Sequence, residues 1–316
     1  MIIPFQSLPS ANILLTGASI FALELPSKLS EIRHATNGAV IQRTLYPQAS
    51  EELAANPRYH LYSFHSAILP DDRAVAVYLP PQYLTEPTRR FPVFYLHDGQ
   101  NLFDGTTSYI AGRTWNAQTT ADDLTLAGCI EPVVLVGVAN TGLRRMAEYT
   151  PTRDFKMGGG EGRNYARLLM EELKPFIDAS YRTLVDSTNT ALGGSSLGGL
   201  ITLYIGLEHP EIFGKLAVMS PSLWWNHRSI LTSVANKKIS TLPRIWLDMG
   251  TAEGARHLRD TDQLYSLLLQ RGWKRGIDVT YLRDQDAVHD ELAWSNRLGS
   301  VMRYLFPTSS ASQHSS

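Results

Sequence analysis

Ser196 stands at the centre of a Gly-x-Ser-x-Gly pattern that runs from Gly194 to Gly198. Thr190 to Leu192 precede it as the end of a short strand, and the apolar stretch Leu200 to Glu208 follows it as a helix. A serine held in a sharp strand-to-helix turn presents its hydroxyl for attack, and small flanking residues let the two backbones approach each other. The pattern therefore predicts Ser196 as a nucleophile.

A serine hydroxyl needs a base within hydrogen-bond reach, and the base needs a carboxylate to orient it. When the serine follows a strand in this way, its partners are expected later in the chain, the acid before the histidine. His289 follows the last expected strand and is the candidate base. His209 suits a capping or surface role, His227 is expected in a polar loop, and His257 is expected between the candidate acid and the next helix.

Glu253 is the preferred acid, because it stands just past the end of an expected strand, Arg244 to Met249. Asp262 is the next candidate, and Asp260 lies close enough in sequence to fold back in the same way. Asp248 falls inside the strand. The alternative role for such a carboxylate is a solvated loop residue or a helix N-cap.

Attack on a carbonyl also creates an oxyanion, which backbone N–H groups can stabilise. The amide of Leu197, directly after the nucleophile, is one expected donor. The second is expected in the loop after the strand Phe91 to Leu96, where Gly99 permits close approach and Gln100 offers its N–H. An ordinary glycine turn is the alternative reading of this loop.

These residues follow the ends of expected strands in a chain where strands and helices alternate, a pattern typical of an α/β fold with a mostly parallel, doubly wound sheet. Tyr59 to Ile68 and Arg73 to Leu79 are expected to form an antiparallel hairpin at one edge of the sheet. The other expected strands are Phe91–Leu96, Ile130–Val138, Lys215–Met219, Arg244–Met249 and Asp278–Leu282. The other expected helices are Ala117–Ala127, Arg163–Ala179 and Thr261–Arg271.

The length of 316 residues predicts one catalytic domain over residues 56–306, an N-terminal extension of unassigned role over 1–55 and a disordered Ser-rich tail over 307–316. A net charge of -1 gives no reason to expect nucleic acid or an anionic membrane as a partner. The N-terminal residues resemble neither a signal peptide nor a membrane span, so a cytoplasmic location is expected. A homo-oligomer remains open.

The chain resembles the esterase family of α/β-hydrolases over residues 60 to 305, and most closely its enterochelin-esterase-like branch. That family includes siderophore, feruloyl and acetyl-xylan esterases and S-formylglutathione hydrolase. The matching stretches are Val75–Pro81, Tyr95–Asp104, Arg145 with Glu148–Pro151, Gly193–Gly199, Ser220–Trp225, and His289 with Trp294. Two departures are Ala287-Val288 before His289, where the family often has Gly-Gly, and Glu253, where many relatives have Asp.

The resemblance implies an α/β-hydrolase fold and a serine-dependent carboxylic ester hydrolase that works through an acyl-enzyme, without cofactor or metal. It places Ser196 and His289 on the family's nucleophile and base. Arg145, with Arg144, could bind an anionic or phenolic acyl group or instead pair with Glu148, and Trp224 and Trp225 could line an aromatic acyl pocket or serve packing.

The natural substrate of such an enzyme would be a small-molecule ester. The alternatives are a siderophore lactone esterase, an acyltransferase that uses an acceptor other than water, and a catalytically silent binding module.

Overall fold

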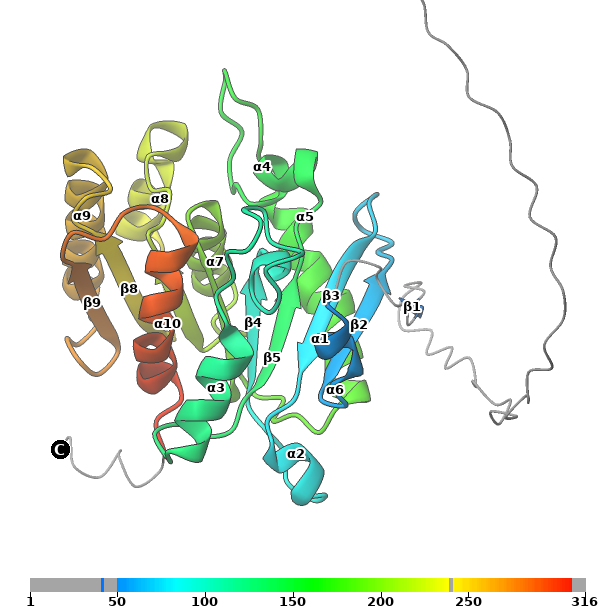
Figure 1. Ribbon diagram of the computed structural model, residues 1–316. Helices are drawn as coiled ribbons and strands as arrows, with labels where there is room; N and C mark the ends of the chain where they lie inside the picture. The colour runs from blue at the N-terminus through cyan, green and yellow to red at the C-terminus, as the bar shows by residue number, and fades with distance from the viewer. Residues whose placement is uncertain (1–40, 43–49, 239–240, 309–316) are drawn as a thin grey trace, which may run out of the picture. The chain divides into compact units, whose positions relative to one another are not determined.

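The computed structural model describes residues 41–42, 50–238 and 241–308 (Figure 1). Most of the expected N-terminal extension, 1–55, and most of the expected tail, 307–316, lie outside the described residues. Within residues 50–308 the chain alternates between strands and helices as the sequence predicts.

The strands form one nine-stranded sheet in the order β1-β2-β3-β5-β4-β6-β7-β8-β9. The first three strands and the β3–β5 pair are antiparallel, and β5, β4, β6, β7, β8 and β9 run parallel. This arrangement confirms the mostly parallel sheet with an antiparallel hairpin toward one edge. The strands are β1 (Ile41–Gln42), β2 (Tyr59–Phe64), β3 (Arg73–Tyr78), β4 (Val93–His97), β5 (Val134–Val138), β6 (Thr190–Ser195), β7 (Lys215–Met219), β8 (Arg244–Gly250) and β9 (Val279–Asp284).

Helices cover both faces of the sheet, as the ribbon in Figure 1 shows. The α-helices are α1 (Glu51–Ala55), α2 (Gln82–Thr85), α3 (Ala117–Leu126), α4 (Arg145–Glu148), α5 (Gly162–Arg167), α6 (Lys174–Ser180), α7 (Leu197–Glu208), α8 (Trp225–Asn236), α9 (Ala255–Gln270) and α10 (Glu291–Leu305). Short 3₁₀ turns are η1 (Gly99–Asn101), η2 (Gly142–Arg144) and η4 (Ser187–Asn189), and η3 (Leu168–Leu173) is a π-helical segment.

Two apolar clusters, one on each face of the sheet, form the core. Successive side chains of a strand point to opposite faces, so in β4 Val93 and Tyr95 enter one cluster while Phe94 and Leu96 enter the other. The first cluster packs the sheet against helices α5 to α9, and the second packs it against α3 and α10. Because the central parallel strands are covered on both sides, they read as nearly unbroken apolar runs.

Several boundaries and local geometries differ from the sequence-based expectation, including the start of β5 at Val134 rather than at Ile130. Helix α9 begins at Ala255 rather than at Thr261, so His257 lies inside its first turns. His227 falls within the bounds of α8, but its φ of 55° and ψ of 34° are left-handed, so it lies in a non-helical kink, in agreement with the expected loop. The expected helix over Arg163 to Ala179 contains the π-helical segment η3, where the i to i+5 pattern adds a residue to the turn.

Candidate active site

Ser196 occupies the turn between β6 and α7 in a strained backbone conformation, with φ 60° and ψ -121°. A non-glycine residue at positive φ is costly and persists only where the surrounding structure enforces it. Glycine is required beside it, because a Cβ on Gly199 would lie 2.7 Å from the carbonyl oxygen of Met219 and one on Gly194 would lie 3.0 Å from Cβ of His97. The turn therefore has the geometry that the Gly-x-Ser-x-Gly pattern predicts.

His289 bridges Ser196 and Glu253 through its two ring nitrogens. Nδ1 lies 2.6 Å from Oε2 of Glu253, and Nε2 lies 2.9 Å from Oγ of Ser196. A carboxylate can only accept, so Nδ1 carries the proton, and Nε2 of the neutral ring is left to accept from the serine hydroxyl. The three residues form one continuous line of hydrogen bonds.

The loop that carries His289 is fixed at the start of α10. The next residue, Asp290, caps that helix by accepting from the backbone N–H of Ala293, and its other oxygen lies 2.9 Å from Arg113. The ring of Trp294 meets the His289 ring edge to face at 4.9 Å. These contacts hold an imidazole whose side chain is 42% exposed in one orientation.

Glu253 is fully buried at its side chain and is held by several donors. Its Oε1 accepts from the Ser220 hydroxyl at 2.6 Å and from the Gly250 N–H at 2.9 Å, and Arg297 lies 3.7 Å away. Burial alone would raise the pKa of this carboxyl, but the hydrogen bonds from His289, Ser220 and Gly250 outweigh it and hold the pKa below its usual range. The group beside His289 is therefore a carboxylate.

The other carboxylates considered from the sequence are engaged elsewhere. Asp262 lies on α9, where it accepts from the Tyr281 hydroxyl and pairs with Arg283. Asp248, inside β8, accepts from Arg297 at 2.6 Å and from the indole of Trp246. Asp260 pairs with Arg228. Of these four acids, Glu253 is the one in contact with His289.

The loop after β4 lies against the first turn of α7. A Cβ on Gly198 would lie 3.4 Å from Cβ of His97 and 3.5 Å from a carboxylate oxygen of Asp98. Gly99 follows, and a Cβ there would lie 2.5 Å from the carbonyl carbon of Gly137, so the turn presses directly onto β5. The side-chain oxygen of Gln100 accepts from the N–H of Asn140, which anchors the loop from its other side.

Arg145 holds this loop through Asp98. Its guanidinium makes two bonds to the Asp98 carboxylate, at 2.8 and 2.7 Å, and Asn140 donates a third at 2.6 Å. Burial raises the pKa of Asp98, but the charge and hydrogen bonds of Arg145 more than offset it and lower the pKa overall. The side chain of Arg145 is 28% exposed, so part of its surface still faces solvent.

The expected alternative, pairing of Arg144 or Arg145 with Glu148, is wrong. Glu148 is buried and forms a two-pronged ion pair with Arg73, also buried, while Arg144 pairs with Glu161. Sequence neighbours are not spatial partners here, because the short helix α4 directs Glu148 inward to the core.

The two tryptophans differ in environment. Trp225 is 1% exposed and belongs to the core, with its indole N–H donated to the carbonyl of Thr152. Trp224 is partly buried and packs against the same cluster. Trp225 therefore serves packing rather than an acyl pocket, and it supports the loop that carries Thr152 and Gly159.

Sequence reasoning assigned no functional role to two serines next to the site, Ser220 and Ser222. Ser220 joins Glu253 to Trp294 and Arg297, whose side chains both donate to its hydroxyl. Ser222 lies with its Oγ 3.3 Å from Oγ of Ser196. The available signal was the stretch Ser220-Pro221-Ser222 after β7, which pairs with β6, the strand that leads to Ser196.

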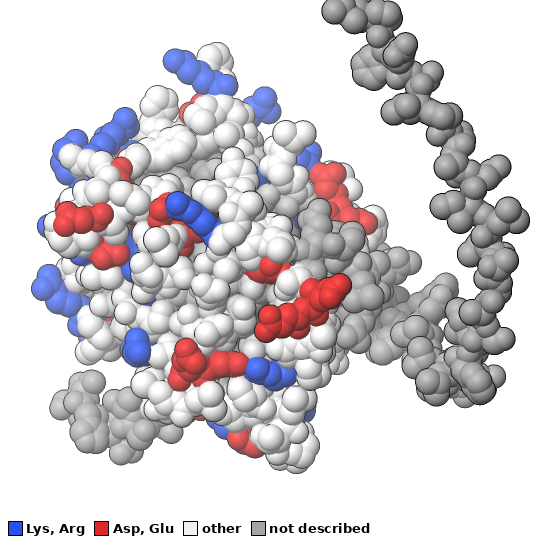
Figure 2. Space-filling model, viewed as in Figure 1, with Lys and Arg blue, Asp and Glu red and all other residues white. Residues whose placement is uncertain are grey.

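Figure 2 shows acidic and basic side chains interspersed with uncharged residues on the face drawn. Within the described ranges, no three or more His, Cys, Asp or Glu side chains gather as ligands for a metal ion. In that same part of the chain, every helix is too short or too polar to cross a membrane.

The chain matches the family described as "Putative esterase" over residues 66–304 and belongs to that family. Together, fold and family define an esterase of the α/β-hydrolase type.

The chain is similar to known proteins in sequence and in structure, and one of them is named an esterase. The uncharacterized protein YbbA of Bacillus subtilis is 26% identical over 74% of this chain and 93% of its own length. The siderophore enterobactin esterase of Emericella nidulans is 37% identical over 45% of this chain and 47% of its own length. The crystal structure of the BES protein from Bacillus cereus superposes with a TM-score of 0.64 at 22% identity, over 84% of this chain and 99% of that one.

Proposed function

We propose that this esterase is a serine enzyme that cleaves small-molecule carboxylic esters through an acyl-enzyme. The observation that carries the proposal is the hydrogen-bonded line Ser196–His289–Glu253, with contacts of 2.9 and 2.6 Å. Such a line supplies the nucleophile, the base and the group that orients the base.

In the first half of the reaction, His289 takes the proton of Ser196 as Oγ attacks the ester carbonyl. Glu253 accepts from Nδ1 throughout and stabilises the imidazolium that forms. The backbone amides of Leu197 and Gln100 hold the oxyanion, since the loop after β4 packs on the first turn of α7. The intermediate then collapses, and His289 returns its proton to the departing alcohol.

In the second half, His289 takes a proton from water, which attacks the acyl carbon. Ser196 leaves as the second intermediate collapses and recovers its proton from His289. Solvent access to the site suits this step, because the His289 side chain is 42% exposed and water can reach Nε2.

The direct test is hydrolysis of a panel of p-nitrophenyl and aryl esters with short acyl, long acyl and feruloyl groups, by the wild type and by Ser196→Ala. The substitution removes the nucleophile and should lower kcat by at least about 10³-fold while leaving the thermal unfolding midpoint in place. Ser195→Ala, one residue earlier in the chain, is the matched control and should keep activity. Ester turnover that survives in Ser196→Ala would refute the serine mechanism.

A siderophore lactone is the second substrate class, supported by the enterobactin esterase of Emericella nidulans. Enterobactin is added to the panel for this reason. A kcat/KM for enterobactin well above that for every aryl ester would assign the chain to this class. An added alcohol that captures the acyl group faster than water would instead identify an acyltransferase.

A catalytically silent binding module is the remaining alternative. It would leave every ester of the panel and enterobactin intact. The hydrogen-bonded line Ser196–His289–Glu253 argues against it, because it gives a serine a base and an orienting carboxylate, which binding alone does not require.

A further inference from the structure

Ser222 is packed directly against the nucleophile. The residue is 4% exposed, its backbone N–H donates to the carbonyl of Ser196 at 2.9 Å, and its Oγ lies 3.3 Å from Oγ of Ser196. Within the described residues, that contact is the one hydrogen bond of its side chain. A buried hydroxyl with one long hydrogen bond is energetically unfavourable in the free protein, so a role in packing alone does not account for it.

The direction of this bond follows from the neighbouring one. Nε2 of His289 accepts the proton of Ser196, because Nδ1 already donates to Glu253. The Ser196 hydroxyl has one proton, so it cannot also donate to Ser222. The Ser222 hydroxyl is therefore the donor and Oγ of Ser196 the acceptor.

We infer that Ser222 is a further catalytic residue, whose hydroxyl stabilises negative charge on Oγ of Ser196. This inference rests on the proposed serine mechanism. Oγ gains negative charge twice, when it loses its proton to His289 on attack and when it departs from the acyl carbon. A donor aimed at Oγ favours both transition states over the neutral ground state.

The distance of 3.3 Å in the free protein agrees with this role. Hydroxyl-to-oxygen bonds are usually 2.5–3.0 Å, and they shorten and strengthen when the acceptor carries charge. Ser222 keeps its proton throughout, so the reaction balances without it. The hydrogen bond from the Ser222 hydroxyl to Oγ of Ser196 shortens as Oγ gains negative charge.

The test is the Ser222→Ala variant, which removes the hydroxyl but retains the backbone bond to Ser196. We expect kcat for a short aryl ester to fall about tenfold with KM nearly unchanged, equivalent to about 1.4 kcal/mol. Labelling by a fluorophosphonate probe, which reports the first attack alone, should slow by a similar factor. Ser222→Thr, which restores a hydroxyl, should recover part of the loss.

Ser229→Ala is the matched control, since its hydroxyl also contacts another hydroxyl, that of Thr152, at 3.1 Å, away from the nucleophile. It should leave kcat and the labelling rate unchanged. Equal or faster turnover in Ser222→Ala, with an unchanged thermal unfolding midpoint, would overturn the inference while leaving the serine mechanism intact. Activity that persists in Ser196→Ala would overturn both.

Discussion

Glu253 is longer by one methylene than an aspartate, and its position explains how it reaches His289. Glu253 lies three residues after the end of β8, in a turn that is closed by its backbone N–H, which donates to the carbonyl of Gly250. The carboxylate then lies against the Ser220 hydroxyl and the Gly250 N–H. This turn accommodates the extra methylene of the Glu253 side chain.

Glu253→Gln should lower kcat by about 10²- to 10⁴-fold, because an amide can donate to Nδ1 and so favour the wrong tautomer of His289. Steady-state kinetics on a short aryl ester measure the loss. Asp262→Asn is the control and should leave kcat unchanged, since Asp262 faces Tyr281 and Arg283. The reverse pattern would make Asp262 the acid.

The sequence could place the candidate nucleophile Ser196 in a strand-to-helix turn, because Gly-x-Ser-x-Gly between a strand and a helix is a local signal. It could not reveal the partner of Arg145, since Asp98 is 47 residues away and meets it only after β4 and β5 pair. The same limit hid Ser220, whose neighbours Glu253 and Arg297 come from distant loops and helices.

At the scale of elements, the turn η1 packs against the sheet through Gly99 and carries Gln100, whose amide is proposed to bind the oxyanion. Gly99 presses on the backbone of β5, with a would-be Cβ 2.5 Å from the carbonyl carbon of Gly137 and 2.6 Å from the nitrogen of Val138. Backbone atoms cannot yield as a flexible side chain does. The position of Gln100 therefore depends on a glycine at 99.

Gly99→Ala should push the loop away from β5, move the Gln100 amide and lower kcat at least about tenfold, with a stability loss of about 1–3 kcal/mol. Aryl ester kinetics and urea unfolding measure the two effects. Gly299→Ala on α10 is the control, because its Cβ would meet nothing closer than 3.5 Å. Full activity in Gly99→Ala would exclude this loop from the oxyanion site.

Element types followed from apolar patterning, but their ends did not. The start of α9 at Ala255 was missed because residues 255–260 are mostly polar or charged and carry no apolar stripe. The π-helical segment η3 was missed because the sequence keeps an amphipathic pattern through it.

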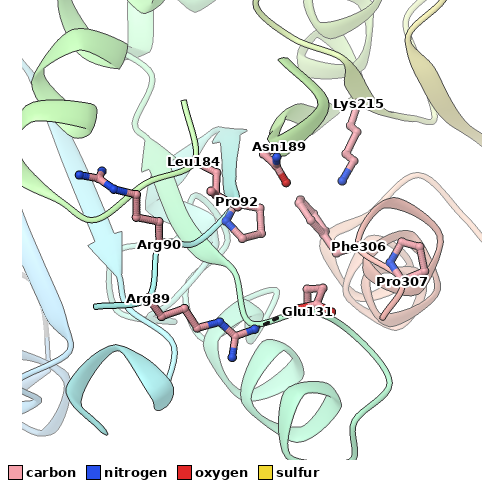
Figure 3. A pocket seen from close by; sticks show the side chains of 9 residues that line it. All are labelled: Arg89, Arg90, Pro92, Glu131, Leu184, Asn189, Lys215, Phe306 and Pro307. Atoms are coloured by element: carbon pink, nitrogen blue, oxygen red, sulfur yellow. Dashed lines mark hydrogen bonds and ion pairs between the residues drawn. The ribbon is translucent and has the colours of Figure 1, made fainter. Parts of the chain in front are cut away.

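At the scale of the whole molecule, the candidate active site lies at the carboxyl ends of the parallel strands, and a separate pocket of about 350 Å³ lies near their amino ends. Figure 3 shows Lys215 and Phe306 on one side of this pocket and the Arg89–Glu131 pair on the other. The Lys215 ammonium lies 4.8 Å from the centre of the Phe306 ring. Burial, with the nearby charge of Arg244, lowers the pKa of Lys215 to about 8.

This shift predicts a pH-dependent stability. Between about pH 8 and the usual lysine value of about 10.4, the unfolded chain holds a proton that the folded chain has lost, so the contribution of Lys215 to stability rises with pH over that window. Lys215→Met should remove this rise and add on the order of 1 kcal/mol at pH 7. Urea unfolding of both proteins at pH 7 and pH 10 measures the difference, and a larger gap at pH 10 than at pH 7 would contradict the prediction.

The fold class was predictable because alternating strands and helices leave few topologies for a parallel sheet. The pocket near the amino ends of the strands was not, since Arg89, Glu131, Lys215 and Phe306 share no sequence pattern. Their proximity follows only from the strand order β4-β6-β7 and the return of α10 across the sheet.

The central claim is that Ser196 becomes covalently acylated with the help of His289. Intact-mass measurement after treatment with a fluorophosphonate, followed by peptide mapping, tests it directly on the wild type, Ser196→Ala and His289→Ala. We expect one adduct per chain on the peptide that contains Ser196, none in Ser196→Ala, and labelling slowed by at least about 10²-fold in His289→Ala. An adduct on another residue, or none on the wild type, would contradict it.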